Sequence, residues 1–409
     1  MGQPYRPDLD NTSVGKRQSY MKHKGRTSLG EYGLYAYYRG LFESKVMDHV
    51  AINELSSLNI KPDKVLFNEI LSRAMGLKGL SQEEASLLLN IEEEEMLQGL
   101  LQAAGEIKRM VMGKRISFFA PLYLSNDCTN NCLYCGFRRD NQRAVRVTLK
   151  EEEIIAEARF LRDRGFKRLL LVTGEDRIKN GVQYLSSAVK VILKHTDFRR
   201  ININAPPMTI DEMRCLRDSG ADLYQSFQET YHKETYAVMH PSGRKRDYVW
   251  RVGVIERAIE AGFSKVGMGV LLGLYDYRFE VLALLAHAAL LRSRYGITPA
   301  AISVPRLRPA PGSMLDKPPY PVSDRAFKKI VAIYRLALPY TDLTVSTRES
   351  EKMRNEVIHT GASVLSAGSR TEPGGYTRSV STGQFETEDK RPLDVMEKVI
   401  MASGLIPDL

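Results

Sequence analysis

Apolar and polar positions follow two different periods along the chain, and the period changes near residue 115. Between about residues 34 and 114 the apolar positions recur every three or four residues, which is typical of amphipathic helices. Ser81 followed by Glu84 has the form of a capping box, in which each side chain accepts a bond from the other residue's backbone N–H. This region predicts a helical N-terminal part that ends near Gly113.

Short apolar runs take over after residue 115. We predict strands at residues 116–124, 168–173, 200–204, 222–228, 264–272, 300–305, 343–347 and 363–367. Segments with helical spacing lie between these runs, at 149–164, 209–218, 247–261, 278–295 and 323–337. A glycine, the residue that often ends a helix, stands before several of the strands: Gly165, Gly220, Gly262 and Gly361.

Eight strand–helix units predict an α/β protein, a parallel (β/α)8 TIM barrel with an N-terminal helical extension. An open doubly wound sheet is the less favoured alternative, because eight units fill a closed barrel. We expect four segments: a polar basic segment at 1–30, a helical region at 31–115, the barrel at 116–380 and a C-terminal helix or tail at 381–409. In such a barrel the active site lies at the carboxyl ends of the strands.

Composition narrows the class of protein. The 409 residues are 43% hydrophobic and 26% charged, as in an ordinary globular protein. The net charge is +10, but basic residues are scattered except in the first fifty residues and in "GRKRDY" at 243–248, so we expect no nucleic-acid partner. No run of 18 apolar residues predicts a membrane span, and the N-terminus lacks a secretory signal. We expect a cytoplasmic, reducing and anaerobic setting.

Three of the four cysteines lie within eight residues, directly after the first predicted strand, in "SNDCTNNCLYCGF": Cys128, Cys132 and Cys135. Thiolates select zinc, copper(I) or iron–sulfur clusters. Structural zinc takes four ligands, and neither a second cysteine pair nor a histidine lies near this motif. We therefore favour a [4Fe–4S] cluster with one iron left open, over structural zinc or three cysteines without a ligand.

The spacing C-x3-C-x2-C, with the aromatic Tyr134 before its last cysteine, resembles the radical S-adenosylmethionine (SAM) superfamily. Further segments resemble its aromatic amino acid lyases, above all the tyrosine lyases: "LLLVTGED", "GLYDYRFE", "SVPRLRPAPG", "STRES" and "GQFETEDKRPLD". That group includes the maturase that makes the carbon monoxide and cyanide of [FeFe]-hydrogenase, and the 2-iminoacetate synthase of thiazole and thiamine biosynthesis. The match covers about residues 75–409, and "GLYDYRFE" and "SVPRLRPA" favour the maturase branch.

The resemblance implies one [4Fe–4S] cluster on the three cysteines, with SAM on its open iron. It also implies L-tyrosine as substrate, a reduced flavodoxin or ferredoxin as electron donor, and room for maturation partner proteins. In the implied reaction a 5′-deoxyadenosyl radical starts cleavage of the Cα–Cβ bond of tyrosine, giving p-cresol and dehydroglycine (2-iminoacetate). A tryptophan lyase stays open as an alternative, as do an iron–sulfur electron carrier and a zinc-binding interaction protein.

One feature departs from the hydrogenase maturase, which carries a C-terminal domain with a second cysteine motif for an auxiliary cluster. No cysteine follows Cys215 in this chain. We expect that domain to be absent, either by truncation or naturally. We also expect the conversion of the glycine fragment to carbon monoxide and cyanide to be absent from this polypeptide.

The resemblance implies SAM contacts near the strand ends, with Tyr134 at the adenine and the "TGED" segment at the SAM ammonium. For Tyr134 the alternative is a surface aromatic, for "TGED" an ordinary helix cap, and for Asn204 a buried structural hydrogen bond. The residues that we expect to bind SAM are Tyr134, Gly174, Glu175, Asp176, Asn204 and Glu229.

A planar guanidinium suits the carboxylate of an amino acid, and for this role we favour Arg308 in "SVPRLRP". The alternative for these arginines is a structural salt bridge, and for a histidine in an apolar helix it is simple packing. The expected substrate-binding residues are Tyr123, Ser303, Arg306, Arg308, Thr347 and Arg348, and the expected catalytic residues are Arg308, Glu229 and His287. Cys215 is expected to be a buried helix residue without a role.

Overall fold

The computed structural model describes residues 49–315, 317–378 and 381–409. The expected basic segment at 1–30 and the start of the helical region lie outside these residues. Within the described residues, four helices precede the first strand: α3 (His49–Ser57), α4 (Lys64–Ala74), α5 (Gln82–Leu89) and α6 (Glu94–Met112). The capping box that opens α5 is confirmed, since Glu84 N–H donates to Ser81 Oγ at 3.2 Å and Ser81 N–H donates to the Glu84 carboxylate at 2.9 Å.

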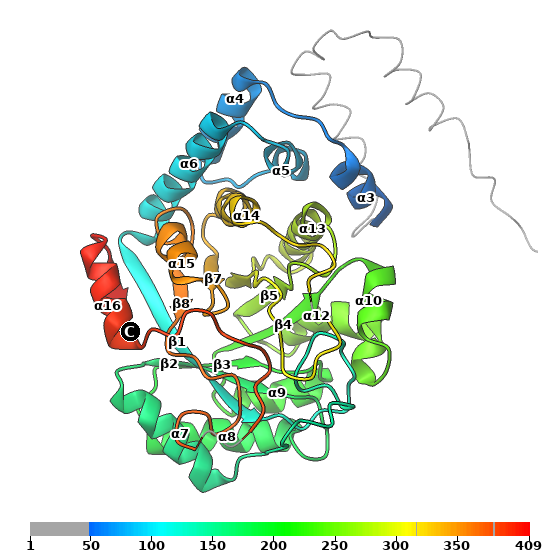
Figure 1. The fold of residues 1–409 in the computed structure, drawn as a ribbon, viewed down its shortest axis with the longest axis vertical. Coiled ribbons are helices and arrows are strands. Elements are labelled where there is room, and N and C mark those ends of the chain that lie inside the picture. Colours follow the sequence, from blue (N-terminus) through cyan, green and yellow to red (C-terminus); the bar gives the residue numbers. More distant parts are fainter. Residues whose placement is uncertain (1–48, 316, 379–380) are drawn as a thin grey trace, which may run out of the picture. The chain divides into compact units, whose positions relative to one another are not determined.

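Eight parallel strands form the closed barrel that the sequence predicts. They are hydrogen-bonded in the order β2, β3, β4, β5, β6, β7, β8, β1, and β1 also pairs with β2, which closes the ring (Figure 1). The strands are β1 (Arg115–Ser125), β2 (Arg168–Thr173), β3 (Arg200–Asn204), β4 (Leu223–Glu229), β5 (Val266–Val270), β6 (Ala301–Ser303), β7 (Asp342–Val345) and β8 (Val364–Ser366).

Helices lie between and around these strands (Figure 1). The segment predicted as one helix at 247–261 forms two, because the chain turns at Gly253. Gly165, Gly220 and Gly262 have positive φ, as a helix-ending glycine often does, whereas Gly361 does not. The helices are α7 (Glu151–Asp163), α8 (Val182–His195), α9 (Ile210–Asp218), α10 (Lys233–Met239), the 3-10 helix η1 (Arg244–Arg246), α11 (Tyr248–Val252), α12 (Val254–Glu260), α13 (Tyr277–Tyr295), α14 (Asp324–Ala337), α15 (Glu351–Val357) and α16 (Leu393–Ala402). Among the described residues no helix is long and apolar enough to cross a bilayer.

A ninth strand, β9 (Ile406–Asp408), follows α16 and was not predicted. It pairs in parallel with the first residues of β1, where Ile406 faces Arg115. The Asp408 carboxylate accepts bonds from Arg168 at 2.6 Å and from Ser117 at 3.0 Å. This strand covers β1 at the barrel end opposite to the carboxyl ends of the strands.

A buried ion pair ties the segment after β8 to the barrel. The guanidinium of Arg354, on α15, bonds the carboxylate of Asp389, and both side chains are 0% exposed. Arg391 reaches the same carboxylate at 2.5 Å. A charge removed this completely from water is costly unless its partner is present. Asp389 therefore holds the C-terminal segment in the position that brings residues 384 and 385 over the barrel.

We predict that Asp389→Ala lowers the free energy of unfolding by about 3–5 kcal/mol, because it leaves the Arg354 charge buried with no carboxylate. Urea denaturation followed by circular dichroism measures this change. Asp163→Ala, at the exposed end of α7, is the matched control and should change the free energy of unfolding by less than about 0.5 kcal/mol. A loss below about 1 kcal/mol for Asp389→Ala would contradict the role assigned to the pair.

Candidate active site

A cavity of about 1340 Å³, including its open mouth, lies at the carboxyl ends of the barrel strands. Its wall is built from β1 to β4 and from β6 to β8, together with the loop that follows β1 and four residues after β8: Ser369, Thr371, Gln384 and Phe385. This is where a parallel barrel collects its functional side chains. The expected site residues that line it are Tyr123, Cys128, Cys132, Tyr134, Cys135, Gly174, Glu175, Asn204, Glu229, Ser303, Thr347 and Arg348.

The loop that carries the three cysteines has little regular structure and is held by side chains. The Arg146 guanidinium donates to the carbonyl oxygens of Asn126 at 2.7 Å, Phe137 at 2.8 Å and Arg138 at 2.6 Å. Gly136 N–H donates to the carbonyl of Gln384 at 3.0 Å. These bonds satisfy backbone carbonyls that neither helix nor sheet covers. The loop therefore keeps its shape through this chain's own contacts.

The three thiols are free and line the same cavity, and Cys132 is only 6% exposed. Burial raises the pKa of each thiol, that of Cys135 to about 11. Among the described residues, no three His, Cys, Asp or Glu side chains are grouped to hold a single metal ion. Three thiols at one cavity, without a fourth donor, fit an iron–sulfur cluster that binds each thiolate through a different iron. This donor set leaves one iron for another ligand.

Cys215 lies apart from this group. It is half-buried on α9 rather than fully buried, with its sulfur 3.7 Å from Ser186 Oγ, and it does not line the cavity.

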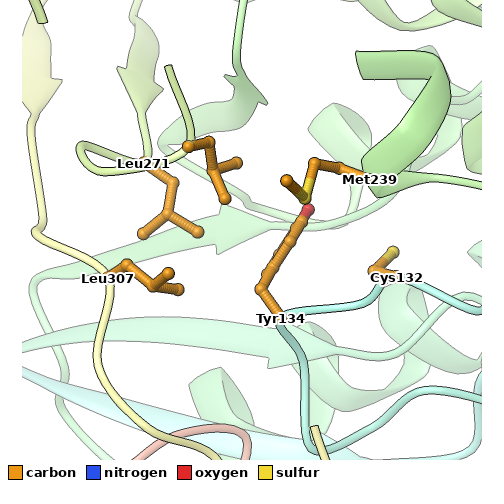
Figure 2. Close-up of a cluster of buried hydrophobic side chains, with 6 residues drawn as sticks. Cys132, Tyr134, Met239, Leu271 and Leu307 are labelled. Atoms are coloured by element: carbon orange, nitrogen blue, oxygen red, sulfur yellow. The ribbon is translucent and has the colours of Figure 1, made fainter. Parts of the chain in front are cut away.

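Tyr134 is buried against an apolar cluster that also contains Cys132, Met239, Leu271 and Leu307. Figure 2 shows its ring extending from the cysteine loop toward Met239. The Tyr134 hydroxyl lies 2.8 Å from His240 Nε2, which fixes the ring's outer edge. The alternative of a surface aromatic does not describe Tyr134, because this side chain is buried and part of it lines the cavity.

Gly174 and Glu175, just after β2, pack directly on the cysteine loop. A Cβ atom at Gly174 would lie 2.3 Å from the Asp127 carbonyl oxygen, so only glycine allows this approach. Thr129 N–H donates to the Glu175 carbonyl at 2.8 Å, and Asn130 donates to its carboxylate at 2.6 Å. The two segments form one wall of the cavity.

Asp176 does not line the cavity. Its carboxylate instead accepts the backbone N–H groups of Ile178 at 3.0 Å and Lys179 at 3.1 Å, as in a turn.

Glu229 ends β4 at a bulge and has a φ of +70°, which is rare for a residue with a side chain. Its carboxylate lies 2.7 Å from Lys245 Nζ and 3.9 Å from Arg251. Burial raises the pKa of Glu229, but these two cations outweigh burial, so its pKa lies below the usual value. Glu229 is an anion whose side chain is 13% exposed and which belongs to an ion cluster.

Lys245 and Arg251 line the cavity and were missed from the sequence. The motif "GRKRDY" carries the available signal, but a short basic run in a sequence is also typical of a solvated surface. Lys245 instead points inward, with its side chain 12% exposed.

Arg348, just beyond β7, is the arginine in the cavity wall whose charge is not matched. It forms no ion pair with any described residue, and its guanidinium carbon lies 3.3 Å from the ring centre of Phe385. Burial lowers the pKa of Arg348, while Tyr123 and Glu229 partly counter that shift. Ser303 and Thr347 line the same cavity. This arrangement leaves a cation in position for an anionic ligand.

Arg306, Arg308 and His287 do not line the cavity. Arg306 is paired with Glu349 and with Asp324, the latter at 2.7 Å. Arg308 lies 2.5 Å from Glu388. The structural salt bridge that was the alternative reading describes both arginines in this structure.

His287 is buried on α13, where the Tyr231 hydroxyl lies 2.8 Å from its Nδ1 and Glu256 lies 3.4 Å from its Nε2. These partners belong to the packing of the helices around the barrel. We assign no catalytic role to His287.

Gln384 and Phe385 also line the cavity, and neither was among the expected site residues. The Tyr123 hydroxyl donates to Gln384 Oε1 at 2.9 Å, which joins β1 to a segment 261 residues further along the chain. In the sequence, "GQFETED" carries only the resemblance, and no local pattern marks its approach to the barrel.

Two family models match the chain: the radical SAM superfamily over residues 122–286, and the biotin and thiamin synthesis associated domain over residues 303–406. The 2-iminoacetate synthase of Escherichia coli (strain K12) is 35% identical over 339 residues, covering 82% of this chain and 89% of that protein. A crystal structure of HydG, a maturase of the [FeFe]-hydrogenase, is 42% identical with a TM-score of 0.85, over 88% of this chain and 80% of that one.

HydG from Carboxydothermus hydrogenoformans is similar too, at 39% identity and a TM-score of 0.81, over 91% of this chain and 84% of that chain. Enzymes of this superfamily use a [4Fe–4S] cluster and SAM, which the cysteine motif and cavity described above fit. The chain therefore belongs to the radical SAM superfamily, in the family of tyrosine lyases that contains 2-iminoacetate synthase and HydG.

Proposed function

We propose that this chain cleaves the Cα–Cβ bond of L-tyrosine, giving p-cresol and dehydroglycine (2-iminoacetate). The observation that carries the proposal is a single cavity lined both by three free thiols and by Arg348, whose charge no described acid matches. A cluster site and a carboxylate site in one cavity are what cleavage of a free amino acid requires.

Cys128, Cys132 and Cys135 hold the [4Fe–4S] cluster in this proposal. When bound, the cluster and SAM supply the 5′-deoxyadenosyl radical that takes a hydrogen atom from the amino group of the substrate. The protein's own task is to orient the substrate amine and to keep water and oxygen away from the site. That task fits a reducing and oxygen-poor cytoplasm.

The wall formed by the cysteine loop, β2, β3 and β4 would hold SAM. Gly174 lets the backbone approach SAM closely, and the Glu175 carboxylate offers an anion to its ammonium group. Tyr134 presents an apolar ring to the adenine, while Asn204 and the Glu229 cluster supply polar groups for the ribose and carboxylate.

The tyrosine carboxylate binds Arg348, since a planar guanidinium can donate two parallel bonds to it. Ser303 and Thr347 stand beside it in the same wall. Arg308 is a weaker choice because Glu388 already occupies its guanidinium. Tyr123, fixed by Gln384, closes the site on the side of β1.

In this proposal the reaction serves maturation of the [FeFe]-hydrogenase active site. The two HydG structures, which are 42% and 39% identical to this chain, support this assignment. The second candidate is supply of 2-iminoacetate for thiazole synthesis, which the 35% identity to 2-iminoacetate synthase favours. Both share the cleavage of tyrosine and differ in the use of the glycine fragment.

Anaerobic reconstitution should give about four irons per chain, because one cluster of this type is expected. The protein should then convert SAM and L-tyrosine to 5′-deoxyadenosine and p-cresol, detected by chromatography. Cys132→Ala should lose the iron and both products, whereas Cys215→Ala, the matched control, should keep them. About eight irons per chain, or indole products from tryptophan in place of p-cresol, would disprove this assignment.

Arg348→Lys should raise the KM for tyrosine by about 10- to 100-fold, since a bidentate charged contact is lost while the positive charge stays. The affinity for SAM, measured by equilibrium dialysis, should change less than about threefold. Arg308→Lys is the matched control and should leave the KM nearly unchanged. The opposite ranking of the two variants would return the carboxylate site to Arg308.

Deletion of the gene in its own host distinguishes the two uses of the fragment. We expect loss of [FeFe]-hydrogenase activity with growth preserved in medium without thiamine. A requirement for thiamine with normal hydrogenase activity would instead assign the chain to thiazole synthesis. Complementation with the Cys132→Ala gene is the control, because that variant retains the barrel without the cluster site.

A further inference from the structure

Gln225, on β4, faces the cavity with an unpaired side chain. Gln225, Phe227 and Glu229 alternate along this strand, and all three line the cavity. The Gln225 amide forms no hydrogen bond with any described residue. A carboxamide can both donate and accept hydrogen bonds. Both capacities of Gln225 are therefore available to a ligand in the cavity.

Glycines on the neighbouring strand make room for these side chains. Strand β5 pairs with β4 so that Gln225 lies beside Gly267 and Phe227 lies beside Gly269. A Cβ atom at Gly267 would lie 2.7 Å from Gln225 Cβ and 3.1 Å from Gln225 Oε1. A Cβ atom at Gly269 would lie 2.7 Å from the Phe227 ring. Because β5 carries no side chain at these two positions, the Gln225 and Phe227 side chains can lie across it.

Gln225 lies deeper in the barrel than the free cation of the site. It stands four residues before Glu229, the last residue of β4, whereas Arg348 lies beyond the carboxyl end of β7. The three thiols also follow the carboxyl end of a strand, β1. Five apolar side chains from β1, β2 and β4 line the same cavity: Phe119, Pro121, Leu170, Val172 and Phe227. The cavity thus has charged and thiol groups at its rim, and an apolar wall with one free carboxamide inside the barrel.

We propose that Gln225 binds the phenol hydroxyl of the substrate and so selects tyrosine over amino acids whose ring lacks that hydroxyl. The inference rests on the proposed function, in which the amino group faces the cluster and the carboxylate binds Arg348. Both groups are attached to Cα, so the ring extends from the rim into the barrel, along the apolar wall.

The phenol and the carboxamide match each other as hydrogen-bonding groups. The phenol oxygen accepts from the Gln225 amide N–H, or the phenol O–H donates to the amide oxygen. A site built to bond a hydroxyl rejects an analogue without it, because the polar group of the site then stays unpaired. Gln225 therefore discriminates at the ring, while Arg348 recognises the part that all amino acids share.

Binding without turnover tests this assignment. Reconstituted protein with SAM, and without reductant, is dialysed anaerobically against L-tyrosine, L-phenylalanine or 4-methyl-L-phenylalanine. Wild type should bind tyrosine at least about 10-fold more tightly than either analogue. Gln225→Leu should weaken tyrosine binding by about 10- to 100-fold. It should also bind the 4-methyl analogue at least about threefold more tightly than wild type does, a gain that misfolding cannot produce.

Gln228→Leu is the matched control, because it makes the same change on the same strand. Gln228 is buried, does not line the cavity, and its two amide atoms have no described partner that the change would leave unpaired. This variant should keep the ratios of the three affinities within about twofold of wild type. Both variants should match wild type in iron content and melting temperature.

Three results would overturn the role of Gln225. One is equal binding of the three amino acids by wild type, and another is an unchanged preference for tyrosine in Gln225→Leu. The third is a loss of SAM affinity with unchanged tyrosine affinity, which would assign Gln225 to SAM together with Asn204, its neighbour on β3. A wild-type protein that binds tyrosine but forms no p-cresol with SAM and a reductant would instead overturn the proposed function.

Discussion

The active site depends on how the loop after β1 is held at the rim of the barrel. This loop carries all three clustered cysteines, yet no ladder of backbone bonds orders it. The Arg146 guanidinium donates to three carbonyls of this loop. Gly174, just after β2, lies so close to the Asp127 carbonyl that a Cβ atom would not fit. One partly buried guanidinium and one glycine thus replace secondary structure along this irregular loop.

Acids balance the cations of the cavity wall unevenly. Glu229 lies near both Lys245 and Arg251, so these three side chains together leave one positive charge in the wall. Arg348 is balanced only by the ring of Phe385 and by more distant groups. A partly buried cation without an acid costs free energy, and a ligand carboxylate would offset that cost. A ligand carboxylate at Arg348 would therefore recover the stability that this unpaired cation costs. The ion pairs of Glu229 instead help to hold the shape of the site.

The sequence predicts the parts of the fold that depend on local pattern. The apolar runs at 168–173 and 200–204 coincide with β2 and β3, and the closed barrel follows from their repetition. Predicted strands at 300–305 and 343–347 are longer than β6 and β7, because their last residues leave the sheet to line the cavity. The cysteine spacing likewise identifies the cluster motif without any structure.

Contacts between distant segments decide which of the expected arginines lines the cavity, and they bring in residues that the sequence does not indicate. Three arginines follow β6 and β7 in similar polar surroundings, and only tertiary partners distinguish them: Glu349 and Glu388 occupy Arg306 and Arg308. Gln384 and Phe385 reach the barrel because Asp389 is anchored by Arg354, a pairing with no sequence signal.

The short segment at η1 shows why a basic run is ambiguous in sequence. In three consecutive residues, Lys245 turns inward to Glu229, while Arg244 and Arg246 are exposed on the outer face. Gly243 permits this turn, since its φ is +91° and a Cβ there would lie 2.4 Å from Asn130 Oδ1. One tight turn thus lets the same basic run stabilise the interior of the site and present charge to solvent beside the cysteine loop.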